Sequence, residues 1–250
     1  MMRSKAFLVA SMLCLAAPGT LAQDPFQVAP RAYKLQLEND WVKVARVHYG
    51  PKEKLPAHDH PRAGTVFVYL NDGGPVRFSH IEAGHPPFPL VRPATVAGGF
   101  RLARAVFEHH EVENLSELPN DFLRIELKTE PLEANTFQGR FPPEPADRTS
   151  QKVAFENAQV RIVRVACAPH ESVEIAGGSS LHALLVALGP AQAVVDKAAG
   201  GSIEMDLGQT LWLEPGQRTT LKNRGNRNVQ QLRFEFKTGP TKADHGVKDE

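Results

Sequence analysis

Cysteine is scarce in this chain of 250 residues, which has only Cys14 and Cys167. We expect Cys14 to be removed with an N-terminal export signal, and a single remaining thiol excludes an intrachain disulfide even in an oxidising compartment. The folded protein must then be stable through packing alone. Cys167 lies in an alternating apolar run, which favours a small buried side chain over a nucleophile.

Neither sign of charge is in excess. The 29 lysines and arginines balance 28 acidic residues, for a formal net charge of +1. No overall field then attracts nucleic acid or an anionic membrane, and we predict no nucleic-acid partner. The sequence also lacks a glycine-rich phosphate loop, a CxxC pair and a Ser-His-Asp order. It therefore offers none of the chemistries that those motifs carry.

Apolar runs are too short to cross a bilayer, for which about 20 residues are needed. An N-terminal apolar run, residues 6–17, follows Arg3 and Lys5 and precedes residues 20–22, TLA, which have small side chains at the two positions that a signal peptidase reads. This pattern is typical of a secretory signal peptide. We expect residues 1–22 to be removed and the mature protein to be secreted or periplasmic, without membrane contact. A retained membrane anchor is the alternative.

Two segments of the chain occur twice. Residues 38–51 read ENDWVKVARVHYGP and residues 156–169 read ENAQVRIVRVACAP, at an offset of 118. LRIELKT at 123–129 returns as LRFEFKT at 232–238, at an offset of 109. Both ends of a unit recurring in the same order indicate a duplicated domain. The predicted organisation is a signal peptide (1–22), a first domain (31–130), a Pro-rich linker (131–150), a second domain (151–238) and a disordered tail (239–250).

Short runs of β-branched and aromatic residues dominate both copies, with turn residues such as those at 71–74 between them. No long stretch with helical periodicity competes outside the N-terminal signal. Many short strands in about 100 residues predict an all-β fold, with one small sandwich or jelly-roll barrel per copy. In the first copy we expect strands at 41–49, 64–70, 76–81, 103–107 and 122–128.

The first copy contains histidines that can meet inside such a barrel: His58, His60, His109 and His110. His58 and His60 are two residues apart, so in a strand both imidazoles point to the same face. A third histidine from a distant strand completes a three-nitrogen metal site with open positions for water or substrate. His110 is the candidate and His109 the alternative. In the alternative interpretation no metal is bound, and these histidines lie in a solvated loop or form hydrogen bonds in the core.

The motifs around these histidines resemble those of the cupins, and the repeat resembles that of a two-domain cupin, or bicupin. Residues 50–60 resemble the first cupin motif, and residues 110–114 match the His-x3-Asn end of the second. The resemblance implies two tandem cupin (jelly-roll β-barrel) domains. It also implies one divalent first-row metal ion, which is iron, manganese, zinc or nickel. The implied ligands of that ion are His58, His60 and His110.

The first copy departs from the cupin motifs at several positions. Lys52 stands where the first motif has a glycine. The family's glutamate ligand is expected at Gly64 or Thr65, so the fourth protein ligand is missing. Ala105 and Phe107 replace the proline and glycine of the second motif. The motif therefore does not fix the turn that leads to the third histidine.

The second copy keeps the strand residues and loses the histidines. The alignment places Ala176 and Gly178 against the paired histidines and Thr219 against the third. We therefore expect a degenerate second domain without a metal site. Any function that depends on the metal then belongs to the first domain.

Other polar residues have structural explanations. His80 and His85 flank a proline-rich insertion in the first copy and are expected on the surface or in a lid. Arg46 and Arg164 recur inside a strand of each copy. That recurrence favours a structural ion pair over substrate binding.

Two hypotheses on function follow. In the first, the protein is a small-molecule metalloenzyme. Three-histidine iron sites occur among cupin oxygenases, so the resemblance implies a dioxygenase-like cleavage of a small oxygenated compound, with Lewis-acid chemistry on zinc or manganese still open. In the second, the protein is a non-catalytic cupin that binds a small ligand or scaffolds a partner. A bicupin supplies domain pairing within one chain, so we expect a monomer, with an oligomer still open.

Overall fold

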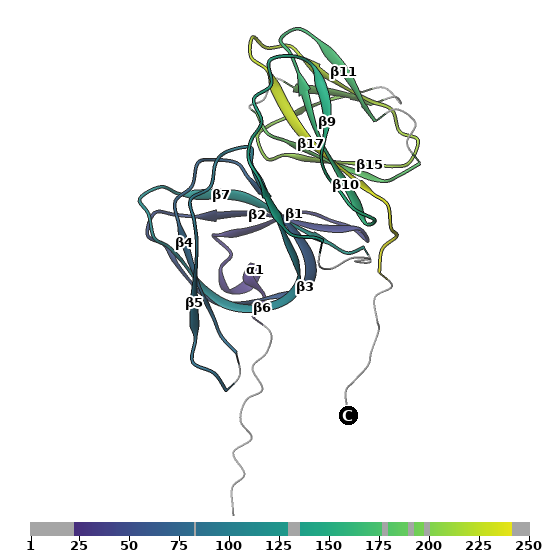
Figure 1. Cartoon of the computed structure of the whole chain (residues 1–250). Helices are drawn as coiled ribbons and strands as arrows, with labels where there is room; N and C mark the ends of the chain where they lie inside the picture. The colour runs from purple at the N-terminus through teal and green to yellow at the C-terminus, as the bar shows by residue number, and fades with distance from the viewer. Residues whose placement is uncertain are drawn as a thin grey trace, which may run out of the picture.

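The computed structural model describes residues 23–82, 84–129, 136–176, 180–189, 193–197 and 201–241 (Figure 1). The predicted signal peptide lies outside these residues, as do Gly178 and parts of the predicted linker and tail. Within the described part of the chain, no helix is long and apolar enough to cross a membrane.

The regular secondary structure of the described chain is almost entirely β-strand, which confirms the predicted all-β fold. Its one helix in the described ranges is the short α1 (Pro25–Val28). The strands of the first half are β1 (Tyr33–Glu38), β2 (Val42–Tyr49), β3 (Lys54–Tyr69), β4 (Val76–His80), β5 (Phe88–Arg92), β6 (Phe100–Asn114), β7 (Asn120–Leu127) and β8 (Gly139–Phe141). Those of the second half are β9 (Ser150–Glu156), β10 (Val160–Cys167), β11 (Ser172–Ala176), β12 (Ala183–Ala187), β13 (Ala193–Lys197), β14 (Ser202–Met205), β15 (Thr210–Leu213), β16 (Thr219–Asn223) and β17 (Val229–Phe236).

Two long strands, β3 and β6, shape the first half. Its antiparallel sheet has the order β1-β2-β7-β3-β6-β4-β5, with β8 also paired to β6. The β3–β6 ladder shifts register between residues 55 and 58, 60 and 63, and 63 and 65. Bulges of this kind bend a strand and increase its twist, so the sheet curls into the barrel seen in Figure 1. The strands expected at 64–70 and 103–107 are parts of these longer strands, because the chain bends at the bulges and does not end there.

The second half repeats the strand order of the first. Its sheets have the orders β15-β12-β17-β10-β9 and β11-β16-β13-β14. Strand β17 lies between β10 and β12 just as β7 lies between β2 and β3. Ala176 pairs with Thr219 as His58 pairs with His110. This is the correspondence that the sequence alignment predicts.

Each half has an apolar interior. The interior cluster of the first half includes Val47, Tyr49 and Phe122, and that of the second includes Val165 and Cys167. Cys167 is fully buried, and burial raises the pKa of its thiol. The structure thus agrees with the prediction of a small core residue at this position.

A third cluster lies between the halves. Val42 and Val44 of β2 point away from the first interior and pack in one cluster with Ile162 and Phe234 of the second half. Strand β2 is therefore apolar on both faces, as a strand buried on both sides must be. The second half packs against the outer face of strands such as β2, and the inner face of the same strands lines the interior of the first barrel.

Parts of the predicted linker and tail contact the first half. Strand β8 lies inside the predicted linker and pairs with β6. Pro240 forms a β-bridge with Thr129, and the Thr241 N–H donates to the Lys128 carbonyl at 2.7 Å. The expectation of disorder from residue 239 was wrong for these two tail residues, because their backbone pairs with the chain just after β7.

Candidate metal centre

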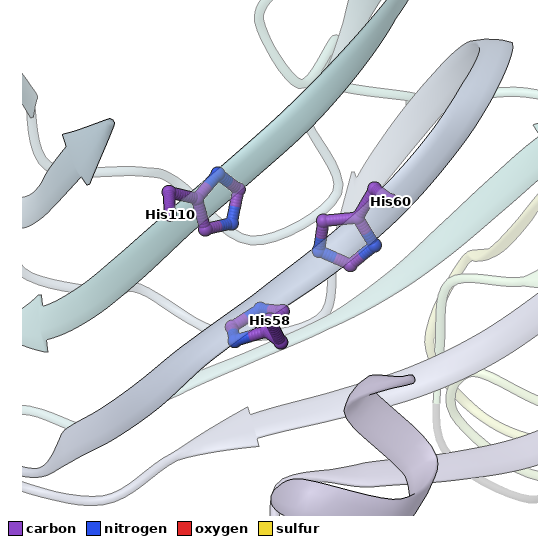
Figure 2. A group of neighbouring side chains, drawn as sticks. All are labelled: His58, His60 and His110. Atoms are coloured by element: carbon purple, nitrogen blue, oxygen red, sulfur yellow. The ribbon is translucent and has the colours of Figure 1, made fainter. Parts of the chain in front are cut away.

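His58, His60 and His110 lie together inside the first barrel (Figure 2). β3 carries His58 and His60, and β6 carries His110, the direct cross-strand partner of His58. One ring nitrogen of each histidine lies within 4.8 Å of the others, and all three residues are at most 3% exposed. The structure thus brings together the three residues that the sequence predicts as ligands.

His109 is turned the other way. It precedes His110 on β6, and successive strand residues face opposite sides. Its Nδ1 forms a hydrogen bond with the carboxylate of Asp59. Asp59 lies between His58 and His60 on β3, so it also faces the side opposite to theirs. Of the two alternatives left by the sequence, the structure therefore selects His110.

Burial keeps the three imidazoles neutral. It lowers the pKa of His58 and His60, and it lowers that of His110 to about 2. The positive charge of nearby Arg124 acts in the same direction on all three. A neutral imidazole retains the lone pair that a metal ion requires, so the site is ready for a cation at neutral pH.

His110 gives the clearest indication that the site takes a ligand. Both of its ring nitrogens are buried and without a hydrogen-bond partner among the described residues. A buried polar group left unpaired costs about 1–3 kcal/mol, and a bound ion would remove part of that cost. Nitrogens about 2.1 Å from one ion in a tetrahedral site lie about 3.4 Å from one another, so the ring nitrogens, which now lie within 4.8 Å of one another, need to approach by at most about 1.4 Å. Three imidazoles suit a divalent first-row ion.

Neighbouring groups orient His58. Its Nδ1 lies 2.8 Å from the Pro56 carbonyl oxygen, to which only a protonated nitrogen can donate, and this leaves Nε2 as the ligand atom. Nε2 lies 3.1 Å from the Tyr33 hydroxyl, which in turn lies 2.9 Å from the Tyr49 hydroxyl. Burial raises the pKa of Tyr33 to about 12. The Tyr33 hydroxyl therefore stays protonated and can donate toward the site.

A buried ion pair lies beside His60. Arg124 Nε donates to Glu126 Oε1 at 2.9 Å, and the same oxygen lies 3.9 Å from His60 Nδ1. Glu126 forms an ion pair with Arg124 and is not part of the ligand cluster. At the positions of the expected glutamate ligand, Gly64 has no side chain and the Thr65 hydroxyl donates to the Ala63 carbonyl at 3.0 Å. The histidines thus leave coordination positions for water or a substrate.

His80, which the sequence places on the surface or in a lid, is half-buried and lies beside the triad. It is the cross-strand partner of His110 on β4, and the two ring centroids lie 5.4 Å apart. Its ring also stacks on Phe88. It does not belong to the ligand cluster. His85 is exposed, as expected.

A cavity of about 250 Å³ opens beside His60. Its apolar wall includes Phe26 and Phe107, and its polar wall includes Lys43. The segment that leads into α1 lines this cavity and is held to β3 by two hydrogen bonds. The Asp59 N–H donates to the Gln23 carbonyl, and the Gln23 N–H donates to Asp59 Oδ2 at 2.8 Å. The site therefore has a covered space next to the imidazoles for a small molecule.

Sequence reasoning did not identify four polar residues around the triad, which are Tyr33, Lys43, Arg124 and Glu126. They come from β1, β2 and β7, strands whose side chains meet those of the triad only in the folded barrel. One signal was available. The pattern Arg-x-Glu recurs in the second copy as Arg233 and Glu235, and charged residues at alternating positions of an apolar strand indicate a polar patch on its inner face.

No family model matches this sequence, and no curated protein matches it. Its structure resembles several solved structures. AerE from Microcystis aeruginosa is 12% identical, with a TM-score of 0.56 over 82% of this chain and 97% of AerE. A mutant of the oxalate decarboxylase OxdC from Bacillus subtilis is 11% identical, with a TM-score of 0.54 over 84% of this chain and 76% of OxdC. A salicylate 1,2-dioxygenase from Pseudaminobacter salicylatoxidans is 11% identical, with a TM-score of 0.53 over 85% of this chain and 78% of the enzyme.

Proposed function

We propose that this chain, which shares its fold with these structures and with a cupin 2 conserved barrel domain protein from Leptotrichia buccalis, binds one divalent metal ion through His58, His60 and His110 and acts there on a small molecule. One observation carries the proposal. Three buried, neutral imidazoles converge, and both ring nitrogens of His110 lack a partner among the described residues. The candidate ions are iron, manganese, zinc and nickel.

The favoured reaction is a dioxygenase-like cleavage of a small oxygenated compound. Three protein ligands leave positions for a chelating substrate and for O2. One of the structural neighbours is a salicylate 1,2-dioxygenase, which supports this reaction without deciding it, because one fold serves many chemistries. When bound, the ion would supply Lewis acidity and, in the case of iron, redox chemistry with O2.

The chain's own residues would hold and orient the substrate. The cavity of about 250 Å³ beside His60 is close to the lower end of ligand pockets, which measure about 300–1,000 Å³. The Lys43 ammonium lies 4.6 Å from the centre of the Phe26 ring and lines this cavity, where it can attract a negatively charged group. The protonated hydroxyl of Tyr33 provides a hydrogen-bond donor on the same wall.

Metal content tests the proposal. Protein without an affinity histidine tag is loaded with each of the four ions in turn, dialysed and analysed by elemental mass spectrometry. We expect about one equivalent per chain in the wild type and in the control His85→Ala, which changes an exposed histidine outside the site. The His58→Ala, His60→Ala double variant should retain none. A folded wild-type protein that retains none of the four ions would falsify the proposal.

A non-catalytic cupin is the second candidate, and the missing glutamate and the lack of histidines at Ala176 and Thr219 favour it. An oxygen electrode separates the two. The metal-loaded protein is incubated with a panel of small aromatic and aliphatic hydroxy acids. Oxygen uptake that is lost in the double variant supports the enzyme, whereas saturable binding without oxygen uptake or product supports the binding protein.

We also propose that the protein is exported, that residues 1–22 are removed and that the mature chain is a monomer. The basic and apolar residues of the N-terminus support export. The shared cluster between the two halves supports a monomer, since it buries inside one chain a surface that a single cupin domain would expose. N-terminal sequencing of protein from each cell fraction, and light scattering of the purified chain, test these two points.

A further inference from the structure

A second pocket, of about 450 Å³, lies on the rim of the first barrel where β6, β8 and the end of β5 meet. We call it the arginine pocket. Its charged lining residues are the guanidiniums of Arg92, Arg101, Arg104 and Arg140 and the carboxylate of Glu108. Positive charge is therefore in clear excess here, although the chain as a whole is nearly neutral.

Within the described residues, Glu108 is the one carboxylate among the residues that line this pocket, so the charges of the four arginines are only partly compensated. The carboxylate of Glu108 lies 3.5 Å from the guanidinium of Arg124, which is outside the arginine pocket. In the described part of the chain, no ion pair engages Arg92, Arg104 or Arg140. Four guanidiniums gathered around one carboxylate repel one another, and a bound anion would relieve that repulsion.

Arg101 and Arg140 are cross-strand partners in the β6–β8 ladder. Partners in an antiparallel ladder project from the same face with their Cβ atoms about 5 Å apart, and like charges in this arrangement are destabilising. An anion placed between the two guanidiniums would replace the repulsion with charge-assisted hydrogen bonds to both.

Arg101 is held in place before any ligand arrives. Its guanidinium carbon lies 4.1 Å from the centre of the Phe67 ring. Burial lowers the pKa of Arg101, and the charge of Arg92 lowers it further while Tyr69 opposes the shift. A planar guanidinium offers a fork of donors that matches a carboxylate or a phosphate. Because the fork is already fixed, it loses little conformational freedom on binding.

We propose that the arginine pocket binds a small polyanion, a molecule with at least two carboxylate or phosphate groups. The ligand would lie near the triad, because the arginine pocket shares Arg101 and Glu108 with the small cavity that reaches His110. The binding needs no metal ion. It therefore stands or falls independently of the function proposed for the histidines.

Calorimetric titration of the metal-free full chain at fixed ionic strength tests the proposal. The probes are pyrophosphate and benzene-1,3,5-tricarboxylate, and the tighter of the two indicates whether phosphates or carboxylates are preferred. The variants Arg104→Gln and Arg140→Gln change exposed side chains, so the fold should be retained. We expect each to weaken binding of the preferred probe by about tenfold. The control Arg31→Gln, at an exposed arginine outside the pocket, should leave the affinity unchanged.

Thermal unfolding provides a second readout. Arg140→Gln removes the repulsion from Arg101, so without a probe this variant should unfold at the same temperature as the wild type or higher. The probe should then raise the unfolding temperature of the wild type by more than that of the variant. The proposal is overturned if the wild type binds neither probe. It is also overturned if the Arg104→Gln, Arg140→Gln double variant binds as tightly as the wild type, or if Arg31→Gln weakens binding equally.

Discussion

Arg46 and Arg164 occupy equivalent positions in β2 and β10, and each reaches a backbone carbonyl of the other half. Arg46 donates to the Leu207 carbonyl at 3.3 Å, and Arg164 donates to the Gly98 carbonyl at 3.0 Å. Leu207 and Gly98 are themselves related by the offset of 109 between the later parts of the two copies. Contacts exchanged in this way are those of a twofold-symmetric interface, here formed within one chain.

Among the described residues, the predicted structural ion pair is formed by Arg46 and not by Arg164. Arg46 donates to both carboxylate oxygens of Asp121, at 3.1 and 2.7 Å. Arg164 donates instead to the amide oxygen of Gln230, the equivalent of Asp121, at 3.2 Å. The prediction was confirmed for Arg46 and wrong for Arg164, because the sequence repeat preserved the arginine and not its partner.

The shared cluster predicts that both halves unfold together. Phe234→Ala removes a fully buried ring from this cluster and should cost about 3–5 kcal/mol of unfolding free energy. Amide hydrogen exchange should then accelerate equally in β7 of the first half and β17 of the second. The control Leu118→Ala, at an exposed side chain, should change neither. Acceleration confined to β17 would show that the halves unfold separately.

Sequence alone was sufficient for His58 and His60, left His109 and His110 as alternatives for the third position, and was insufficient for the surroundings of the triad. His58 and His60 were predictable because alternation in a strand fixes which residues share a face. His80 and Tyr33 reach the same place through pairing register, which no local pattern of residues determines. The full length of β3 was unpredictable for a related reason, since its bulges depend on the curvature of the whole sheet.

The lowered pKa values of the histidines predict a pH dependence of stability. Burial holds the pKa of His58, His60 and His110 below the ordinary value of 6.5. The unfolded chain therefore binds more protons than the folded one below about pH 6.5, and the unfolding free energy of the metal-free protein decreases as the pH falls. For His110 this loss continues down to a pH of about 2.

Urea unfolding of metal-free protein at pH 7, 6 and 5 measures this effect. The variant His110→Leu removes one of the depressed groups, so its midpoint should fall less steeply with acidification than that of the wild type. His85→Leu, at an exposed histidine, should follow the wild type. Parallel curves for the wild type and His110→Leu would mean that His110 does not contribute.

Removing one charge of the buried Arg124–Glu126 pair should lower the stability of the protein more than removing both charges. Glu126→Gln leaves a buried guanidinium with a weaker partner, and breaking such pairs costs about 3–5 kcal/mol. The double variant Arg124→Met, Glu126→Leu removes both charges and should recover much of that loss. Urea unfolding at pH 7 compares the variants. A double variant no more stable than Glu126→Gln would show that Arg124 is required for another reason, such as its contact with Glu108.

Tyr33 should compete with the metal ion for His58. Its hydroxyl lies 3.1 Å from Nε2, the nitrogen that is free to bind a metal because Nδ1 is engaged by Pro56. A hydrogen bond of this kind contributes about 0.5–1.5 kcal/mol, so Tyr33→Phe should tighten zinc binding by roughly two- to tenfold. Competition against a chromophoric chelator measures the affinity. Tyr49→Phe keeps the bond between Tyr33 and His58 and should leave the affinity nearly unchanged. Weaker zinc binding in Tyr33→Phe would instead mean that the hydroxyl supports the bound ion, since a competitor cannot improve binding by its presence.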